Sequence, residues 1–480
     1  MLEKIGLFFL CFFILAFDTY SQEPTIGFNK TLGGSGVDVV YDITSDIEGN
    51  LVLAGLTDSN NGDISCQSKG NGDIWLVCMD LEGNILWQQC YGGSEAEFPS
   101  RILRTSDHGF LVTCRTFSND GDISGYHGNS DIWIVKTDSM GVLKWQRCLG
   151  TSGGDFPKFS MQLKNGRYLI ASVTVGVDGD FTEHYGSNFG LDAWITILNT
   201  DGVIDTSYHY GGSKDDQIRE VIEKPNGDRV FIGFSDSYDY DLITTFEYGS
   251  DDGWIFKTDS DNNLIWTNRW GGSNVDQYVS GVEILDGGYF LLGASASTNG
   301  EFLGNHGDVD IWVVKVDSLG NKSWQKFYGG SKADASDGEN RLAKLNDNLF
   351  AIGGWSNSDD GDVGLNYGKE DYWFLAIDSG GNITGKKVLG GSDNDYMYSS
   401  RCIMSSIFQV GQTYSDDYDI LLSHGNGDGW VIELSNVDII GEFNIDTLQI
   451  KVYPNPINGG FNILLPDQLL QKRFLLKFYL

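Results

Sequence analysis

Proline and long hydrophobic runs are both scarce in this chain of 480 residues. There are 7 prolines against 63 glycines, so glycine, aspartate and asparagine must supply most turns. After residue 17, no segment approaches the roughly eighteen consecutive apolar residues that read as a membrane-spanning helix. No stretch keeps a helical period of apolar residues, so helices should be rare. The sequence therefore predicts neither a helical bundle nor an integral membrane segment in the body of the protein.

Positive charge is also in short supply. Lys and Arg number 32 against 67 Asp and Glu, which gives a net charge of −35. Nucleic acid and anionic membrane surfaces would repel a protein of this charge. An acidic surface suits solvation, cation binding or both. We therefore expect no nucleic-acid partner.

Cysteine and histidine give no framework for the fold or for catalysis. The six cysteines beyond the amino-terminal segment do not recur at one repeat position; they are Cys66, Cys78, Cys90, Cys114, Cys148 and Cys402. Cys78 and Cys90 fall on successive expected strands and could pair. His127, His306 and His424 share one repeat position, where other repeats have Tyr or Lys. No zinc-type spacing and no Ser/His/Asp or Cys/His arrangement marks one repeat, so no catalytic residue is predicted.

The amino-terminal segment has the pattern of a secretory signal peptide. Lys4 precedes the apolar run 5–17, and Thr19 and Ser21 supply the small residues needed for cleavage before Gln22. The apolar run is too short to span a bilayer comfortably. We therefore expect residues 1–21 to be removed and the mature protein to be secreted, either extracellular or at the cell surface. An uncleaved membrane anchor is the alternative.

Two motifs recur seven times at the same spacing. The first is Asp-x-Trp followed by an apolar run: Asp73/Trp75, Asp131/Trp133, Asp192/Trp194, Asp252/Trp254, Asp310/Trp312, Asp371/Trp373 and Asp428/Trp430. The second is Gly-Gly-Ser-x-x-Asp with small variations, and its copies begin 58 to 61 residues apart at Gly33, Gly92, Gly150, Gly211, Gly271, Gly329 and Gly390. A fixed period of this kind indicates repeated units that cover one another's apolar faces.

Each repeat is predicted to contain four short strands. In the first repeat these are 39–43, 51–55, 74–78 and 85–89, rich in β-branched and aromatic residues. Tight Gly/Asn/Asp turns join the first strand to the second and the third to the fourth, while a polar loop joins the second to the third. The result is an antiparallel meander.

A four-stranded unit repeated around an axis predicts a seven-bladed β-propeller, an all-β fold. A β-solenoid is the competing architecture, but two hairpins per repeat disfavour it. The seventh repeat lacks a fourth strand, whereas residues 26–32 resemble an orphan one, so the amino-terminal strand should complete the last blade. We expect the propeller to occupy residues 22–436, followed by a linker at 437–447.

Antiparallel pairing places the long acidic loops and the Gly-Gly-Ser segments on one face, here called the upper face. Clustered Asp oxygens around a glycine could bind calcium, which prefers about six to eight oxygen ligands. The candidate ligands are Asp58, Asp63, Asp120, Asp122, Asp178, Asp180, Asp360 and Asp362. No loop matches a full calcium-binding motif, and Asp-Gly is also ordinary turn chemistry, so structural turns are the alternative.

The recurring carboxylates and tryptophans favour structural roles. The last residue of the second motif is Asp in six repeats and Glu97 in the second repeat. A carboxylate at that place should cap backbone N–H groups where one blade meets the next. The seven tryptophans should pack between blades rather than form a ligand platform.

The segment 448–480 contains Tyr453-Pro454-Asn455-Pro456 followed by a Gly turn and an apolar strand. It resembles the type A C-terminal sorting domain of type IX secretion in Bacteroidetes-type bacteria. The resemblance implies export through that machinery and a shortened sorting domain. The repeats are also similar to those of large secreted proteins of the same bacteria, which implies a fold and a location more than an activity.

The sequence favours a non-catalytic binding module. Acidic upper-face loops with Trp, Tyr, Asp and Asn suit a polysaccharide, and a surface protein is the other candidate partner. The alternative is a polysaccharide-degrading lyase or hydrolase, because fold alone does not decide function. A catalytic site should break the repeat symmetry. Blade 4 departs most from the pattern, with Tyr238-Asp239-Tyr240-Asp241 in its loop.

Overall fold

The computed structural model describes residues 23–183, 185, 191–242, 249–299, 302–336, 338, 341–435 and 437, and two short strands at 451–453 and 462–464. The chain divides into two units, and the unit Glu23–Val437 carries the repeats. In the other unit only β30 (Lys451–Tyr453) and β31 (Asn462–Leu464) are described, and they pair antiparallel. The predicted signal peptide and nearly all of the predicted linker and sorting domain lie outside the described residues, and they stay predictions.

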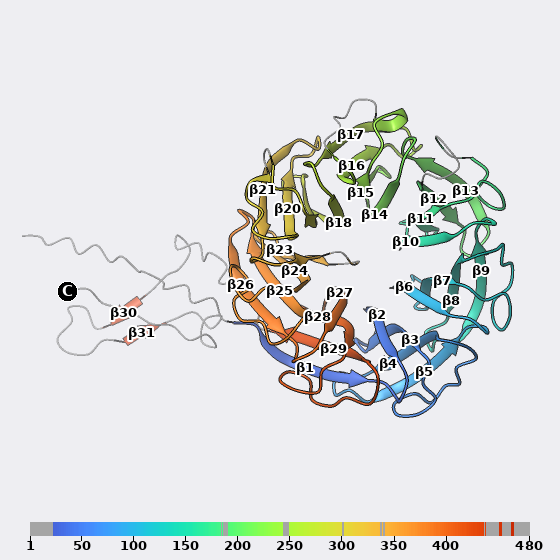
Figure 1. The fold of residues 1–480 in the computed structure, drawn as a ribbon, viewed down its shortest axis with the longest axis horizontal. Coiled ribbons are helices and arrows are strands. Elements are labelled where there is room, and N and C mark those ends of the chain that lie inside the picture. The colour runs from blue at the N-terminus through green and yellow to red at the C-terminus, as the bar shows by residue number, and fades with distance from the viewer. Residues whose placement is uncertain are drawn as a thin grey trace, which may run out of the picture. The chain divides into compact units, whose positions relative to one another are not determined.

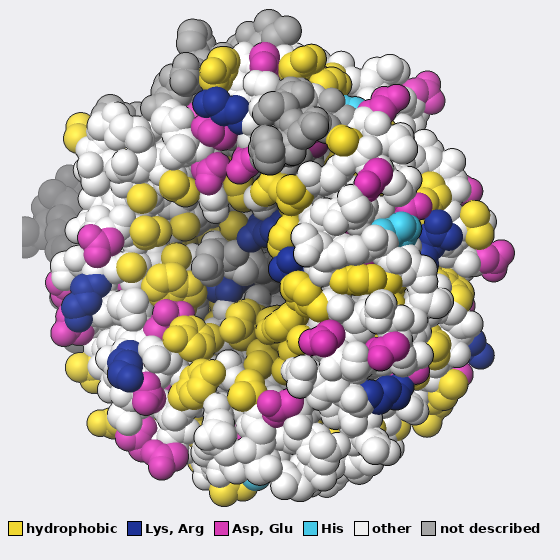
Figure 2. Space-filling view, turned by 45° about the vertical axis from the view of Figure 1, so that its right-hand side comes forward, with side chains coloured by type: hydrophobic (Ala, Val, Ile, Leu, Met, Phe, Trp, Pro, Cys, Tyr) yellow, Lys and Arg dark blue, Asp and Glu magenta, His cyan; other side chains and the backbone are white. Residues whose placement is uncertain are grey.

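The repeats form seven antiparallel sheets arranged in a ring (Figure 1), and the space-filling view shows a hollow at its centre, here called the central channel (Figure 2). The predicted seven-bladed β-propeller is confirmed. Blade 1 contains β2 (Asp38–Ser45), β3 (Leu51–Thr57), β4 (Asp73–Met79) and β5 (Ile85–Tyr91); blade 2, β6 (Glu97–Arg104), β7 (Phe110–Thr116), β8 (Asp131–Thr137) and β9 (Leu143–Leu149); blade 3, β10 (Asp155–Gln162), β11 (Tyr168–Thr174), β12 (Asp192–Leu198) and β13 (Ile204–Tyr210).

The remaining blades repeat the same order from the channel outward. Blade 4 contains β14 (Asp216–Glu223), β15 (Arg229–Ser235), β16 (Asp252–Thr258) and β17 (Leu264–Trp270); blade 5, β18 (Asp276–Glu283), β19 (Tyr289–Ser295), β20 (Asp310–Val316) and β21 (Lys322–Tyr328); blade 6, β22 (Asp334–Ala335), β23 (Leu342–Asn346), β24 (Leu349–Ser356), β25 (Asp371–Asp378) and β26 (Ile383–Leu389); blade 7, β27 (Asp395–Ile403), β28 (Ser406–Thr413), β29 (Asp428–Ser435) and β1 (Thr25–Leu32).

The amino-terminal strand closes the ring, as predicted. β1 pairs antiparallel with β29, from Thr25 opposite Ser435 to Leu32 opposite Gly429. Leu32 is fully buried, and Trp430 donates its indole N–H to the side chain of Asn29 at 2.9 Å. β1 therefore supplies the outer strand that blade 7 lacks.

The core lies between the blades rather than at the centre of the ring. Every residue of β3 and β4 is buried, because both faces of a blade pack against neighbouring blades. One apolar cluster combines residues of blades 1 and 2, and another combines residues of blades 4 and 5. Each blade is therefore stabilised by its neighbours.

The inner strands share a β-bulge. In six blades one residue of the inner strand has no partner in the next strand: Tyr41, Ser100, Lys158, Arg219, Val279 and Tyr398. A bulge interrupts the alternation of side chains and re-aims them. Inner-strand residues beyond it therefore face positions that simple alternation does not predict.

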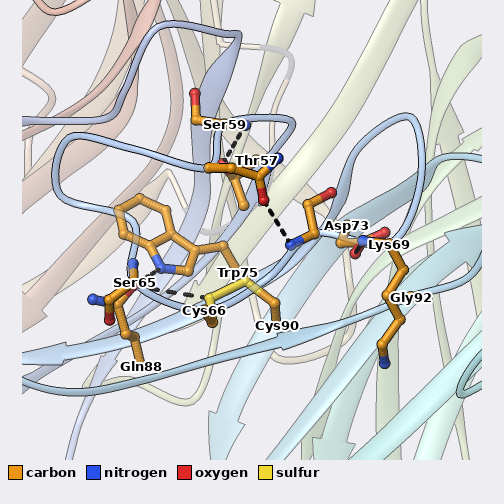
Figure 3. Close-up of a disulfide and its surroundings, with 12 residues drawn as sticks. Thr57, Ser59, Ser65, Cys66, Lys69, Asp73, Trp75, Gln88, Cys90 and Gly92 are labelled. Carbon is orange, nitrogen blue, oxygen red and sulfur yellow. Dashed lines mark hydrogen bonds between the residues drawn. A yellow bond between two sulfur atoms is a disulfide. The ribbon is translucent and has the colours of Figure 1, made fainter.

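The disulfide differs from the suggested pairing. Cys66 bonds to Cys90, while Cys78 is a buried free thiol (Figure 3). The register of β4 and β5 explains the difference, because Cys90 lies opposite Trp75 and Cys78 lies opposite Trp87. Cys66 reaches Cys90 from the loop between β3 and β4.

Helices are nearly absent from the described residues, as expected. They contain the 3-10 turn η1 (Tyr240–Leu242). Among these residues, no helix has the length and apolar character to cross a membrane.

Removing β1 should destabilise the whole ring. A chain that begins at Gly33 loses the burial of Phe28 and Leu32, at about 1.5–3 kcal/mol for each side chain. The free energy of unfolding, measured in urea, should fall by at least about 3 kcal/mol relative to a control chain that begins at Glu23. Equal stability of the two chains would contradict closure by β1.

Candidate functional site on the upper face

The acidic upper-face loops fold back onto the connections that enter the blades. The first carboxylate of each predicted calcium pair accepts a backbone N–H at 2.5–2.7 Å: Asp58 from Val37, Asp120 from Ser94, Asp178 from Ser152 and Asp360 from Ser331. The second accepts the N–H of the first glycine at 3.1–3.2 Å in three blades: Asp63 from Gly33, Asp122 from Gly92 and Asp180 from Gly150. All four also donate their own N–H to the carbonyl of that glycine, at 2.9–3.0 Å, as Asp362 does to Gly329. These contacts are turn chemistry.

Calcium binding stays a prediction. The eight candidate carboxylates lie in four different blades, so they form four separate pairs rather than one site. Within the described ranges, no three His, Cys, Asp or Glu side chains are grouped to hold a metal ion. A calcium ion at one of these pairs would need further oxygen ligands from the backbone or from water.

The carboxylate that begins each inner strand caps the preceding connection. It accepts the N–H of the residue four positions earlier, at 2.6–3.1 Å, in every blade: Asp38 from Gly34, Glu97 from Gly93, Asp155 from Thr151, Asp216 from Gly212, Asp276 from Gly272, Asp334 from Gly330 and Asp395 from Gly391. Hydroxyl groups of the loop after the second strand add further bonds, such as that from Ser59 to Asp38 at 2.8 Å. The hydrogen bonds therefore confirm the predicted capping role.

The tryptophans of the Asp-x-Trp motif are packed side chains, at most 4% exposed. Six of them lie in apolar clusters that combine residues of two adjacent blades: Trp75, Trp133, Trp194, Trp254, Trp312 and Trp373. The seventh, Trp430 of blade 7, contacts the ring of Tyr372 in blade 6 at a centroid distance of 4.5 Å. All seven rings therefore lie where one blade meets the next.

Five of these tryptophans donate the indole N–H to the outer strand of their own blade: Trp75 to Gln88, Trp133 to Gln146, Trp254 to Thr267, Trp312 to Gln325 and Trp430 to Asn29. Within the described ranges, the buried indole nitrogens of Trp194 and Trp373 have no hydrogen-bond partner. In four blades the acceptor lies thirteen residues after the tryptophan, and that position is Ser207 in blade 3 and Lys386 in blade 6.

The two exceptions follow from the residues at that position. An ammonium group cannot accept a hydrogen bond, so Lys386 cannot serve Trp373. The hydroxyl of Ser207 pairs with that of Thr196 at 3.3 Å instead of with Trp194. Packing alone holds these two rings, and Trp194 contacts Phe181 at a centroid distance of 4.9 Å. The constant spacing of the motif did not predict this difference between blades.

The aspartates of the same motif accept backbone N–H groups. In five blades the donor lies four residues earlier: Asp73 from Lys69, Asp131 from His127, Asp310 from His306, Asp371 from Tyr367 and Asp428 from His424. Asp192 accepts the N–H of Tyr185, and Asp252 contacts Arg269. The contacts of this motif are therefore structural.

The first glycine of the second motif lies between two buried carboxyl groups. A Cβ on Gly390 would lie 2.3 Å from Asp371 Oδ1 and 2.8 Å from Asp395 Oδ2. The same crowding recurs at four other junctions: Gly33 between Asp428 and Asp38, Gly92 between Asp73 and Glu97, Gly150 between Asp131 and Asp155, and Gly329 between Asp310 and Asp334. Glycine is required here because any side chain would displace the carboxyl groups.

The mouth of the central channel breaks the repeat symmetry. Two positions at the upper end of each blade differ from blade to blade: the residue after the capping carboxylate and the residue after the second strand. In blades 2, 3 and 7 these residues are Phe98, Phe117, Phe156, Val175, Tyr396 and Tyr414. In the other four blades they are Val39, Asp58, Gln217, Asp236, Gln277, Ala296, Ala335 and Asn357. Phe98 and Tyr414 are 40% and 44% exposed, and Figure 2 shows hydrophobic side chains gathered around a central hollow.

Cations stack on the aromatic side of this rim. The Arg115 guanidinium lies 3.9 Å from the ring centre of Phe156 and 4.4 Å from that of Phe117, so it bridges blades 2 and 3. The Lys158 ammonium group lies 5.6 Å from the ring centre of Phe156. Cation–π contacts of this kind hold both partners in place. This side of the rim is therefore aromatic and positively charged.

The rim of blades 4 and 5 is acidic and polar instead. Gln277 donates from its side chain to Asp251 at 2.9 Å. Burial raises the pKa of Asp251, and the carboxylates of Asp236 and Asp215 raise it further. The two sides of the mouth thus offer different chemistry to a ligand.

Charged side chains occupy the channel below the rim. Asp42 of blade 1 accepts hydrogen bonds from Arg401 of blade 7 at 2.5 and 2.9 Å and from the hydroxyl of Ser399 at 2.8 Å. These residues were not predicted from the sequence. A charged residue that interrupts the apolar pattern of an inner strand is the signal that could have found them, and the bulge turns such a side chain toward the channel.

Glu220 of blade 4 extends this charged set across the channel. It accepts a hydrogen bond from Ser280 at 3.3 Å, and Arg101 of blade 2 and Arg401 are close enough to stabilise its charge. Burial has the larger effect and raises the pKa of Glu220. Residues of blades 1, 2, 4 and 7 therefore contribute to one charged set below the aromatic rim.

Blade 6, rather than blade 4, departs most from the repeat. Its inner strand is divided into β22 and β23. The capping Asp334 and its partner Ser356 are 22 residues apart, whereas Asp276 and Ser295 of blade 5 are 19 apart. Blade 4 has the regular order β14 to β17. The expectation for blade 4 was wrong because it rested on loop composition and not on the length of the inner strand.

A cavity of about 420 Å³ lies on the lower face, between blades 1 and 2. Apolar and acidic side chains line it together, including Ile47, Trp87, Met140, Glu48 and Asp107. The neighbouring Cys78 is a poor nucleophile, because burial raises the pKa of its thiol to about 12.

No protein-family model matches the sequence, and no curated protein matches it. Several solved structures are similar at low identity. A puromycin hydrolase is 12% identical with a TM-score of 0.44, over 90% of this chain and 57% of the hydrolase, so this chain spans little more than half of it. YCF48 bound to D1 peptide is 9% identical (TM-score 0.42; 86% and 98% covered), and BBS1N in complex with ARL6DN is 9% identical (0.43; 86% and 99%). Likeness at this level says nothing about ligand or activity.

Chelation tests the calcium prediction. If calcium occupies the loop carboxylates, EDTA should lower the melting temperature, because a ligand that binds only the folded state stabilises it. Added calcium should restore the melting temperature, and magnesium serves as the control cation. An unchanged melting temperature in EDTA would contradict calcium binding, and the carboxylates would then have a structural role alone.

Substitution of Gly390 tests the crowded junction. Gly390→Ala should lower the free energy of unfolding by about 1–3 kcal/mol, the usual cost of overpacking. Gly385→Ala is the matched control, because a Cβ there would meet its nearest atom, Ala376 Cβ, at 3.6 Å, an ordinary contact. Equal melting temperatures for the two variants would contradict the crowding.

Proposed function

We propose that this protein is an exported, non-catalytic β-propeller that binds a polysaccharide at the mouth of its central channel. The asymmetric rim carries this proposal. Scaffold residues recur in every blade, but the aromatic side chains at the mouth occur in blades 2, 3 and 7 only. The propeller does not need them, and exposed aromatic groups clustered around a hollow are typical of binding sites.

The chemistry of the rim suits a sugar chain. Aromatic rings such as Phe98 and Tyr414 can pack on the apolar faces of sugar rings. The opposite side of the mouth offers Asp236, Gln217 and Gln277, whose side chains can bond hydroxyl groups. The acidic loops lie around this mouth on the same face.

Three observations support export. Residues 1–21 have the pattern of a signal peptide, and the segment 448–480 resembles a sorting domain. The Cys66–Cys90 disulfide suits an oxidising compartment. We therefore propose an extracellular or cell-surface location, reached through the machinery that reads such a domain.

A polysaccharide-degrading enzyme is the weaker proposal. Glycoside hydrolysis needs an acid and a second carboxylate on opposite sides of the bond that breaks. Glu220 has the raised pKa of an acid, but both oxygens of Asp42 already accept hydrogen bonds from Arg401. The binding function requires no such pair.

Glycan binding by the mature domain tests the proposal. Phe98→Ala, Phe156→Ala and Tyr396→Ala should each weaken binding of a glycan found on an array by about tenfold, or 1.4 kcal/mol. Leu285→Ala is the control, because Leu285 is 76% exposed in the turn between β18 and β19, away from the rim, and it should leave binding unchanged. Thermal melts check that each variant folds.

Three outcomes would count against the proposal. Glycan binding unaffected by all three rim variants would place the site elsewhere. Binding of a surface protein but of no glycan would assign the rim to a protein partner. New reducing ends or unsaturated products from a bound polysaccharide would show an enzyme.

A further inference from the structure

At the blade junctions, the aspartate of the Asp-x-Trp motif and the capping carboxylate of the next blade form a buried pair. These pairs differ in the positively charged side chain that lies beside them. Lys69 and three histidines hold the position four residues before the aspartate at four of the junctions. His127 and His306 place Nδ1 2.7 Å from Asp131 and Asp310, and His424 places it 3.4 Å from Asp428. Between blades 4 and 5, Arg269 Nε lies 3.5 Å from Asp252. Between blades 6 and 7 the corresponding residue is Tyr367, which brings no positive charge.

The pair between blades 6 and 7 is Asp371 and Asp395, both fully buried. Asp395 Oδ2 accepts the N–H of Gly391 at 2.7 Å and the hydroxyl of Ser415 at 3.0 Å. Asp371 Oδ2 accepts the N–H of Tyr367 at 2.9 Å, while Asp371 Oδ1 is buried and accepts no hydrogen bond from the described residues. Asp371 Oδ1 and Asp395 Oδ2 converge on the same point above Gly390.

Other charged groups near the pair do not neutralise it. Asp419 adds to the negative potential at Asp371, and Asp393 adds to that at Asp395. The two nearby lysines are engaged with those outer carboxylates, Lys369 with Asp393 at 2.7 Å and Lys387 with Asp419. The remaining titratable neighbours on the packed elements are Tyr367 and Tyr372, which are neutral, and the buried Arg341, which donates to the carbonyl of Met397 and whose charge acts on Tyr372.

Two buried carboxylates at such close range cannot both stay ionised without a cation. A proton on Asp371 Oδ1 removes the repulsion. It also turns this buried oxygen into a possible hydrogen-bond donor on the side of Gly390 that Asp395 shares. We propose that Asp371 and Asp395 bind one shared proton in the folded ring, and that losing it as the pH rises loosens the junction of blades 6 and 7.

The direction of the pH dependence follows from the pKa values. Burial raises the pKa of Asp371 to about 7, and the neighbouring Asp395 contributes to the rise; burial raises the pKa of Asp395 to about 6. The usual aspartate pKa is 3.8. The folded state therefore holds more protons than the unfolded chain between about pH 4 and about pH 7. This contribution to stability is complete below about pH 4 and disappears as the pH rises through about 7.

The substitution Asp371→Asn tests the shared proton. The amide keeps the size of the carboxyl group and stays uncharged at any pH. The melting temperature of the variant minus that of the wild type should increase from about pH 5 to about pH 8, because only the wild type loses a proton there. Asp378→Asn is the matched control on β25: its pKa is lowered, so the difference should stay flat in this range. A flat difference for Asp371→Asn as well would overturn the proposal.

Infrared spectroscopy of the wild-type protein is a second test of the shared proton, and it needs no stable variant. The carbonyl band of a protonated carboxyl group should be present near neutral pH and should titrate away as the pH rises. Asp371→Asn, or Asp395→Asn if the first does not fold, should weaken that band without removing it, because other junctions also hold carboxyl pairs. No such band near neutral pH, or a band unchanged in the folded variant, would show both carboxylates to be ionised.

Discussion

Each blade is stable only between two neighbours, because its middle strands are buried on both faces. β3 and β4 contain no exposed residue, so a single blade in water would expose two apolar surfaces. In the closed ring, each of the seven blades packs against two neighbours through the same kind of contact. Capping carboxylates, crowded glycines and buried tryptophans all serve the contact between adjacent blades, and this is why they recur with the period of the fold.

Function is then best sought where the repetition fails. The capping carboxylates and buried tryptophans recur at every junction, and their roles can be explained by packing and hydrogen bonding. The aromatic rim, the charged set inside the channel and the divided inner strand of blade 6 are not required by that packing. All three border the central channel. The features that differ between blades therefore lie around the channel, where one ligand can contact several blades at once.

The sequence predicted most of the fold. Recurrence of Asp-x-Trp at a fixed spacing defined seven blades, and the resemblance of residues 26–32 to a fourth strand predicted ring closure. The Cys66–Cys90 bond was not predictable, because it depends on the register between β4 and β5 and on the path of a loop. The channel residues Asp42 and Glu220 were missed because a bulge of one residue changes the direction of inner-strand side chains, and neither composition nor spacing reveals it.

Closure through β1 also imposes an order on folding. Thr25 pairs with Ser435, so the last blade cannot be completed until almost the entire repeat region is available. Hairpins within a blade are local and can form early, whereas this pairing must bring together distant parts of the chain and is therefore slow. Before that step the polypeptide is an open arc, and β29 exposes an unpaired edge that invites association with other chains. During folding, the protein is therefore least prone to association with other chains when the edge of β29 stays covered until β1 pairs with it.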